Sequence, residues 1–351
     1  MSPIGGMEGT MRLCVGTAKG IIVLDPERGG TPLMVLADPT SVWCMAQDCE
    51  DRNTLYAGSI HNLQAGSARG RGSLTRSSDG GRSWQDITPR NARDEEVWAL
   101  ATAPDISGQV FVGTSHARIF RSDDTGYSFQ ECSSFLKLPG RERWSFPLPP
   151  HIPHVRSIAF DPHEPNTIYI GVEEGGIFRS RDRGESFEPT NHNIYPDIHC
   201  VMVDPDDSER LYATTGRGLY ISPDAGASWR FVKGLSRSYT IPLLMRSGPD
   251  AAIYTAAAAG PPPTWPMSPA GAHALMFRSS DRGESFLPLG AGDGSTHATR
   301  GMVMSLREDC SGRLLATLSD GSLLRINDGE DITMIAEKLP PAYDLVALPD
   351  N

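Results

Sequence analysis

The chain has 351 residues, with 36 glycines, 28 prolines and only 7% aromatic side chains, a composition typical of a turn-rich β protein. Its 43 acidic and 32 basic side chains give a net charge of −11, which argues against nucleic acid as a partner, and no apolar run is long enough to cross a membrane. The N-terminus has neither the basic nor the apolar segment of an export signal, so we expect a cytoplasmic protein. Length alone leaves one or two domains open.

Seven short apolar strands that end in small residues recur along the chain. They lie at 13–17, 55–59, 110–114, 168–172, 211–215, 253–257 and 314–318. Another strand that ends in a turn precedes each of them except the first, as in 97–105, 155–162 and 198–205. The C-terminal segment 343–350 has the form of that missing partner. We therefore expect seven units, with the two ends of the chain sharing one sheet and closing a ring.

A second pattern, S-x-D-x-G-x-S followed by Trp or Phe, occurs once in each of five units. Its copies lie at 77–84, 122–129, 180–187, 222–229 and 279–286, with degenerate copies at 325–332 and 24–30. In such a turn the aspartate accepts hydrogen bonds from backbone amides, the glycine takes a conformation closed to other residues, and the aromatic ring packs between sheets. We interpret Asp79, Asp124, Asp182, Asp224 and Asp281 as structural rather than catalytic.

This repeat resembles the Asp-box, or BNR, repeat of sialidase-like β-propellers, a group that includes xyloglucan hydrolases, sortilin-type receptors and the photosystem II assembly factor. The resemblance covers nearly the whole chain. It implies an all-β, seven-bladed β-propeller of four-stranded antiparallel blades, formed by residues 1–351 as a single domain and closed by N- and C-terminal strands that share one blade. It also implies that the repeats lie on the face opposite the active site.

Six of the seven residues that stand three positions after the small residue of the second strand are ionisable. The seven residues at this position are Lys19, His61, His116, Glu174, Arg217, Ala259 and Asp320. His61, His116 and Glu174 belong to three consecutive units, and neutral imidazole with carboxylate is a ligand set for Zn, Mn or Fe(II). We therefore predict a divalent metal site there. General acid/base histidines, a plain anion-binding pocket and solvated loop residues remain alternatives.

A second layer of candidates stands where the inner strands begin. Its members are Trp43, Trp98, Arg156, His199, Met302 and Asp344, with His154 just before Arg156. We predict His154, His199 and Arg156 as catalytic residues. The predicted substrate-binding residues are Arg217, Arg300, Trp43, Trp98, Asp344 and Lys19. Arg156, Arg217 and Arg300 can clamp a carboxylate or phosphate, because guanidinium binds such groups through two hydrogen bonds.

The sequence departs from true sialidases. LCVGTAKGIIV replaces the arginine motif F/Y-R-I-P that the resemblance leads one to expect near the first strand, and Tyr239 is a weak candidate for the tyrosine nucleophile. Xyloglucan hydrolases of the group are secreted and about twice as long, which argues against that identity. Two insertions, 131–153 and 259–274, carry Trp144, Trp265 and His273, which we interpret either as lid or stacking residues or as part of a rigid cover.

Six cysteines without a CxxC pair indicate reduced thiols. We predict a cytosolic hydrolase or lyase that acts on a small anionic or sugar-like substrate in a pocket at the centre of the ring, with a divalent metal and no nucleotide cofactor. The alternative is a non-catalytic binding or assembly scaffold.

Overall fold

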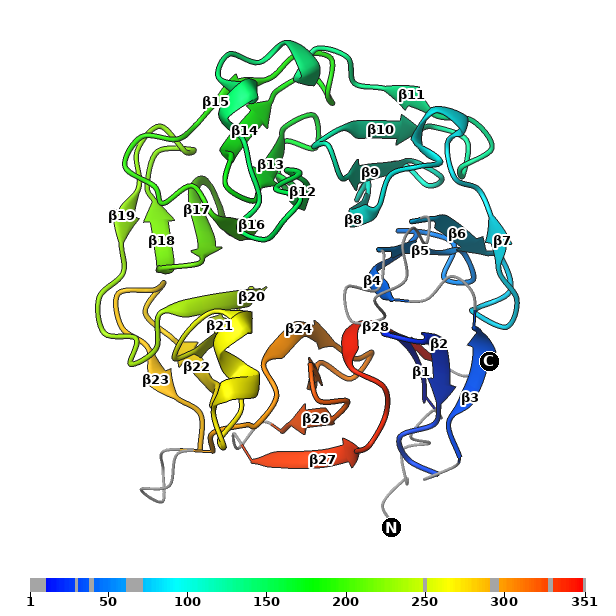
Figure 1. Ribbon diagram of the computed structural model, residues 1–351, viewed down its shortest axis with the longest axis vertical. Coiled ribbons are helices and arrows are strands. Elements are labelled where there is room, and N and C mark those ends of the chain that lie inside the picture. Colours follow the sequence, from blue (N-terminus) through cyan, green and yellow to red (C-terminus); the bar gives the residue numbers. More distant parts are fainter. Residues whose placement is uncertain are drawn as a thin grey trace, which may run out of the picture.

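A computed structural model describes residues 11–28, 31–37, 41–60, 72–248, 251–290, 297–327 and 331–349. Its strands form seven four-stranded antiparallel sheets arranged as blades around a central axis (Figure 1). The predicted seven-bladed β-propeller is therefore confirmed. No helix in these ranges is long and apolar enough to span a membrane.

Blade 1 joins the two ends of the chain, as the sequence predicted. Its strands, from the axis outward, are β28 (Ala342–Pro349), β1 (Met11–Thr17), β2 (Gly20–Leu24) and β3 (Leu33–Leu36). The register of β1 on β28 pairs Cys14 with Val346 and Met11 with Pro349. This pairing closes the ring by joining the two ends of the chain in one blade.

Blades 2 to 4 follow in chain order, each with its first strand at the axis. Blade 2 contains β4 (Val42–Gln47), β5 (Leu55–Ser59), β6 (Leu74–Ser77) and β7 (Gln85–Asp86). Blade 3 contains β8 (Val97–Thr102), β9 (Val110–Thr114), β10 (Ile119–Ser122) and β11 (Gln130–Glu131). Blade 4 contains β12 (Val155–Phe160), β13 (Ile168–Val172), β14 (Gly176–Ser180) and β15 (Glu188–Pro189).

Blades 5 to 7 repeat the arrangement. Blade 5 contains β16 (Ile198–Asp204), β17 (Asp207–Thr215), β18 (Gly218–Ser222) and β19 (Arg230–Phe231). Blade 6 contains β20 (Tyr239–Arg246), β21 (Ala252–Ala258), β22 (Leu275–Ser279) and β23 (Leu287–Pro288). Blade 7 contains β24 (Val303–Glu308), β25 (Leu314–Leu318), β26 (Leu323–Ile326) and β27 (Ile332–Ala336). Within the described ranges, the connections also contain the short 3-10 helices η1 (Arg90–Ala92), η2 (Phe135–Lys137), η3 (Arg141–Arg143) and η4 (Pro262–Met267).

The hydrophobic core lies between neighbouring blades, in seven clusters of buried apolar side chains. This packing explains the glycine near the end of the second strand in blades 2 and 3. A Cβ added to Gly58 would lie 2.4 Å from Val97 Cγ1 of the next blade, and one added to Gly113 would lie 2.5 Å from Val155 Cγ1. The close approach of adjacent sheets therefore requires glycine at these positions.

The repeated S-x-D-x-G-x-S pattern forms the hairpin between the third and fourth strands. In blade 4, Asp182 accepts hydrogen bonds from the Ser186 amide (2.8 Å), the Ser186 hydroxyl (2.5 Å) and the Ser180 hydroxyl (2.7 Å). Gly184, with φ of +90°, donates its amide to Ser180 Oγ. The other four copies have the same bonds, so these aspartates are structural, as expected.

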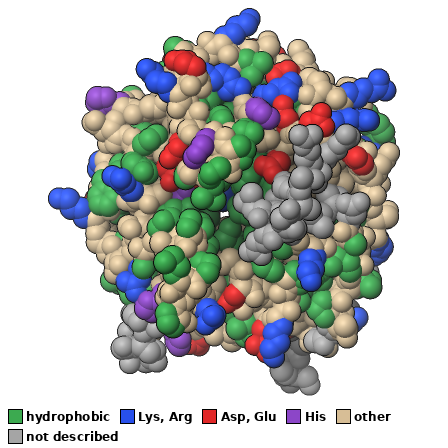
Figure 2. All heavy atoms as spheres, viewed as in Figure 1, with side chains coloured by type: hydrophobic (Ala, Val, Ile, Leu, Met, Phe, Trp, Pro, Cys, Tyr) green, Lys and Arg blue, Asp and Glu red, His purple; other side chains and the backbone are tan. Residues whose placement is uncertain are grey.

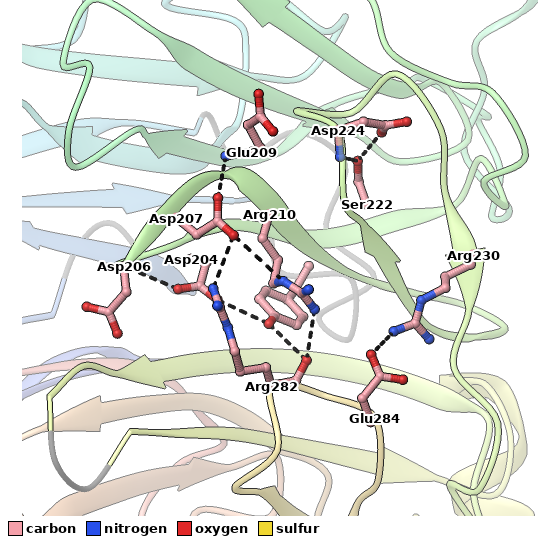
Figure 3. A network of polar contacts seen from close by, with 11 residues as sticks. Asp204, Asp206, Asp207, Glu209, Arg210, Ser222, Asp224, Arg230, Arg282 and Glu284 are labelled. Carbon is pink, nitrogen blue, oxygen red and sulfur yellow. Dashed lines mark hydrogen bonds and ion pairs between the residues drawn. The ribbon is translucent and has the colours of Figure 1, made fainter.

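Residues of these hairpins also tie neighbouring blades together. Arg282, from the hairpin of blade 6, lies 3.0 Å from Asp204 and 3.3 Å from Asp207 of blade 5 (Figure 3). Arg230 and Glu284 pair in the same region at 2.5 Å. Because inner strands begin at one face and third strands end at the other, the hairpins lie on the face opposite the start of the inner strands.

Candidate functional site

Each inner strand contains a β-bulge where it begins. The register between first and second strands shifts by one residue in all seven blades. The side chains at these bulges line the central cavity: Trp43, Trp98, Arg156, His199, the Ile241–Pro242 pair, Met304 and Tyr343. We call these residues the bulge ring, and the face on which they lie the mouth. Bulges commonly redirect a side chain at a functional site.

The bulges correct two positions of the predicted second layer. The matching of inner-strand starts placed Met302 and Asp344 with Trp43 and Trp98, but Met302 precedes β24 and is fully buried, whereas Met304 lines the cavity. In blade 1 the extra residue is Tyr343, because Gly16 pairs with Asp344 and Thr17 with Ala342. Because a bulge inserts one residue into the strand, an alignment of the blades made by counting residues is shifted by one position there.

Three consecutive blades contribute aromatic side chains to the ring. The ring centroid of Trp43 lies 4.6 Å from that of Tyr343 and 5.1 Å from that of Trp98. The guanidinium carbon of Arg156 lies 4.8 Å from the Trp43 ring centroid and 5.9 Å from that of Trp98. The mouth thus combines an aromatic surface with a cation held against it.

The cavity behind the bulge ring has a volume of about 490 Å³ and follows the inner strands through the molecule. Its lining runs from His199 at the start of β16 to Val203 near its end. Seen along the axis, hydrophobic side chains lie along part of the rim of the central opening (Figure 2). The volume suits a small ligand or a few sugar residues.

Charged side chains are buried beside Arg156. His154 is 1% exposed and stacks on Trp98, with 3.8 Å between the ring centroids. Its Nε2–H donates to Glu173 Oε2 at 2.9 Å, and Arg156 Nε lies 3.4 Å from the same oxygen. Glu173 comes from the turn between β13 and β14, a position that the predicted spacing missed by one residue.

His199 is held by two neighbours. Its Nδ1–H donates to the carbonyl of Thr240 at 2.5 Å, which leaves Nε2 directed toward Asp197 Oδ1 at 3.5 Å. Asp197 immediately precedes β16 and was not predicted. Its place two residues before the predicted His199 is the signal that could have identified Asp197. Glu173 lies far from both in the sequence, and only the folded structure brings it to Asp197.

The pKa values of these groups are shifted by their surroundings. Burial alone would raise the pKa of Glu173, but the charges of His154, His199 and Arg156 outweigh burial and hold it well below its usual range. Burial alone would lower the pKa of His199, but the carboxylates of Asp197 and Glu173 raise it. Each charge at this site therefore stabilises its opposite.

Of the predicted metal ligands, His61 lies outside the described residues, so that set stays a prediction. His116 is exposed, and its carbonyl accepts a hydrogen bond from Arg141 at 2.5 Å. Glu174 is half-buried, and burial together with the charges of Asp197 and Glu173 raises its pKa. Both have positive φ, 58° and 50°, in the turns between second and third strands.

The structure places the predicted substrate-binding residues in different environments. Trp43 and Trp98 lie in the bulge ring. Asp344 borders the cavity but is buried, paired with Arg307 at 2.8 Å and bonded to the Met45 amide at 2.9 Å. Arg307 is a second cavity arginine that sequence reasoning missed.

Two other arginines and a lysine lie outside the ring. Arg217 stacks on Tyr195, 4.6 Å from its centroid, and Arg300 donates to the Pro269 carbonyl at 3.0 Å. Lys19 is exposed in the turn between β1 and β2. Among the three arginines predicted as a clamp, Arg156 is the one that lines the cavity.

The insertion 131–153 is packed against blade 4. Phe135 is fully buried and contacts Phe178, and Trp144 packs there as well, with 4.8 Å between its ring centroid and that of Phe178. Both rings therefore pack against blade 4, and the choice between a lid and a cover stays a prediction. Phe146, which was not singled out, reaches the mouth, and its ring centroid lies 4.8 Å from that of His154.

The insertion 259–274 forms η4 beside blade 6. Trp265 donates its indole N–H to the Gly260 carbonyl at 2.8 Å, and its ring centroid lies 6.1 Å from that of Tyr239. Tyr239 in turn contacts His199, with centroids 4.8 Å apart. His273 is exposed and faces Arg237.

Sequence comparison connects the chain with xyloglucanases. A comparison with models of known protein families finds no match. Over 152 residues the chain is 32% identical to the xyloglucanase Xgh74A of Acetivibrio thermocellus, covering 36% of this chain and 17% of the relative. Over 144 residues it is 25% identical to a probable oligoxyloglucan-reducing end-specific xyloglucanase of Neosartorya fischeri, covering 38% and 17%. The chain spans less than a fifth of the length of these relatives.

Comparison with solved structures gives the same fold. The GH74 xyloglucanase from Xanthomonas campestris matches with a TM-score of 0.66 and 16% identity, over 93% of this chain and 52% of that chain. An ancestral GH74 enzyme matches with a TM-score of 0.61 and 16% identity, over 88% and 38%. YCF48 bound to a D1 peptide matches with a TM-score of 0.56 and 15% identity, over 86% and 89%. The chain is thus a seven-bladed β-propeller whose curated sequence relatives include xyloglucanases.

Proposed function

We propose that the chain binds a sugar-like substrate at the mouth and hydrolyses it there. The observation that carries this proposal is the bulge ring. Three successive blades place Tyr343, Trp43 and Trp98 at the entrance of a 490 Å³ cavity, next to Arg156 and His199. Flat aromatic rings offer apolar area with little loss of conformational entropy, and the ionised groups beside them supply hydrogen bonds that orient a polar ligand.

The similarity to xyloglucanases supports a glycan as the class of substrate, and the serine-aspartate repeat supports membership of the Asp-box group. Hydrolysis needs a proton donor and a group that activates water. His199, which lines the cavity, and Asp197, directly behind it, supply these roles in the proposal. His154 lies behind Trp98 and acts as a positioning residue for Glu173.

The test combines binding with turnover. Binding of xyloglucan oligosaccharides is measured by calorimetry, and release of reducing ends from xyloglucan is measured with cellulose oligosaccharides as a comparison. Replacing Trp43 by alanine is expected to weaken binding about 10-fold, as loss of a central aromatic anchor does. The matched control is Tyr127→Ala, which removes an aromatic side chain that is 79% exposed on the opposite face.

A non-catalytic binding module is the second candidate. It is favoured by the likeness to YCF48 bound to a D1 peptide, which covers 89% of that chain. Binding of the oligosaccharide without release of reducing ends would support a binding module over a hydrolase. If wild-type protein binds no oligosaccharide, the proposal of a sugar-like substrate is wrong.

A further inference from the structure

Three ligand-type side chains meet behind the wall of the cavity. Glu173, Asp197 and His199 each direct one donor atom toward the others, and these atoms all lie within 4.8 Å of one another. All three residues are buried, with 6%, 7% and 4% exposure. Glu173 belongs to blade 4, whereas Asp197 and His199 belong to blade 5. Among the residues that the structure describes, this is the one such group of three or more.

Two of the three donor atoms have no hydrogen-bond partner within the described part of the chain. They are His199 Nε2 and Asp197 Oδ1, which face one another at 3.5 Å. A buried polar atom without a partner costs about 1 to 3 kcal/mol, more when it is charged. The fold nevertheless keeps both atoms directed into the cluster, which points to a ligand between them.

The groups behind the donor atoms resemble those behind metal ligands. A metal-bound histidine normally donates its second ring N–H to a carbonyl or carboxylate, and ligating carboxylates are themselves hydrogen-bonded. His199 donates Nδ1–H to the Thr240 carbonyl at 2.5 Å, so Nε2, which lies 3.5 Å from Asp197 Oδ1, is the ring atom that would ligate. Glu173 Oε2 accepts from His154 at 2.9 Å. A hydrogen bond to a neighbouring residue therefore orients both His199 and Glu173.

We propose that Glu173, Asp197 and His199 bind a divalent transition-metal ion, Zn²⁺ or Mn²⁺, that ties blade 4 to blade 5 behind the mouth. One imidazole with two carboxylates suits these ions, whereas Ca²⁺ prefers six to eight oxygen ligands. The ion would also balance the negative charge of two carboxylates that are buried side by side. This site shares no ligand with the predicted set His61, His116 and Glu174. It uses His199 and Asp197, the residues given the roles of proton donor and water-activating group in the proposed hydrolysis, so an ion bound there would occupy both side chains.

The test is a metal titration of the full chain after removal of metal with a chelator. Zn²⁺ and Mn²⁺ are added separately and followed by calorimetry and by thermal unfolding, with Ca²⁺ as a comparison. We expect binding of one Zn²⁺ or Mn²⁺ per chain, a higher Tm, and weaker binding of Ca²⁺. His199→Gln and Asp197→Asn should each weaken metal binding more than about 100-fold. His154→Gln changes the residue that orients Glu173 and should weaken metal binding by about 10- to 100-fold.

Two variants serve as matched controls. His116→Ala and Glu174→Gln change the other predicted metal ligands and should leave the affinity unchanged. Loss of binding in His116→Ala with binding retained in His199→Gln would overturn the proposal, as would the absence of metal binding by the wild-type protein.

A second measurement covers the case in which the ligand variants do not fold. X-ray absorption of the zinc-loaded wild-type protein reports the atoms around the ion directly. The proposal requires nitrogen and oxygen neighbours with one imidazole. Sulfur neighbours, or several imidazoles from exposed histidines, would overturn it.

Discussion

Replacing Glu173 by glutamine, in protein kept free of metal by a chelator, measures what one buried charge at the mouth contributes to stability. The Glu173 side chain is 8% exposed, accepts a hydrogen bond from His154 and lies 3.4 Å from Arg156. Glutamine keeps the shape and one acceptor oxygen but removes the charge opposite Arg156. Removing one partner of a buried ion pair costs about 3 to 5 kcal/mol. Because His154 keeps an acceptor, we expect the lower end, about 3 kcal/mol.

This free energy corresponds to a measurable change in melting temperature. With an unfolding entropy of about 2 cal/mol/K per residue, a loss of 3 kcal/mol lowers the Tm of this chain by about 4 °C. The assay is thermal unfolding followed by circular dichroism at pH 7 with EDTA present. The result is read as the difference from wild-type protein under the same conditions.

The neighbouring residue provides a control of opposite sign. Burial and the carboxylates of Asp197 and Glu173 raise the pKa of Glu174 in the folded protein. An acid with a raised folded pKa loses stability as the pH rises above its unfolded pKa, so its ionised form is unfavourable at pH 7. Glu174→Gln should therefore leave the Tm unchanged or raise it slightly. If both variants melt within about 1 °C of each other, the assignment of distinct roles to these two glutamates is refuted.

Three further predictions concern the blade architecture and the limits of the site. The Ser285 hydroxyl and amide lower the pKa of Asp281 to about 2, so its ionised form contributes stability above a pH of about 4 that is lost as the pH falls toward 2. In urea unfolding, Asp281→Asn should lower the free energy of unfolding by about 1 kcal/mol or less at pH 7, and by less than that at pH 3. A difference that persists in full at low pH would contradict the assignment. Gly113→Ala should lower the free energy of unfolding by about 1 to 3 kcal/mol, because its new Cβ is forced against Val155. The double variant Gly113→Ala/Val155→Ala should lose less free energy than the sum of the two single variants, and an effect equal to that sum would show that the contact does not constrain the sheets. Arg217→Ala should leave oligosaccharide affinity unchanged, because Arg217 stacks on Tyr195 away from the cavity, and a loss of about 10-fold would place it in the site.

The fold could be predicted from the sequence because its signals are local and repeated. The small residue at the end of each second strand and the serine-aspartate hairpin both have a physical cause within one blade or between two neighbours, as Gly113 and Asp182 illustrate. The closure of blade 1 followed from the unpaired strand at each end of the chain. Each of these features is visible in a short stretch of sequence that recurs from blade to blade.

The candidate site was predicted only in part, because it depends on features that counting cannot reveal. The bulges add Tyr343 to the cavity lining beside Asp344, and they place Met304 there instead of Met302. A single-residue insertion of this kind has no signature in the alternation of apolar residues. His199 was predicted from its place at the start of an inner strand.

The carboxylates beside His199 were missed for a different reason. Asp197 precedes its strand and Glu173 lies in a turn of the neighbouring blade, and the two meet only because the blades pack side by side. The sequence spacing selected Glu174 instead, whose position in the turn has a positive φ. Contacts between blades are therefore the part of the site that requires the folded structure.

A crystal structure of the protein with a xyloglucan oligosaccharide tests the central claim most directly. The account predicts a sugar residue against Trp43 and Tyr343, with a hydroxyl group within hydrogen-bond distance of Arg156 or His199. An oligosaccharide bound only at the hairpin face or at the outer edge of a blade, with the bulge ring empty of ligand, would contradict it.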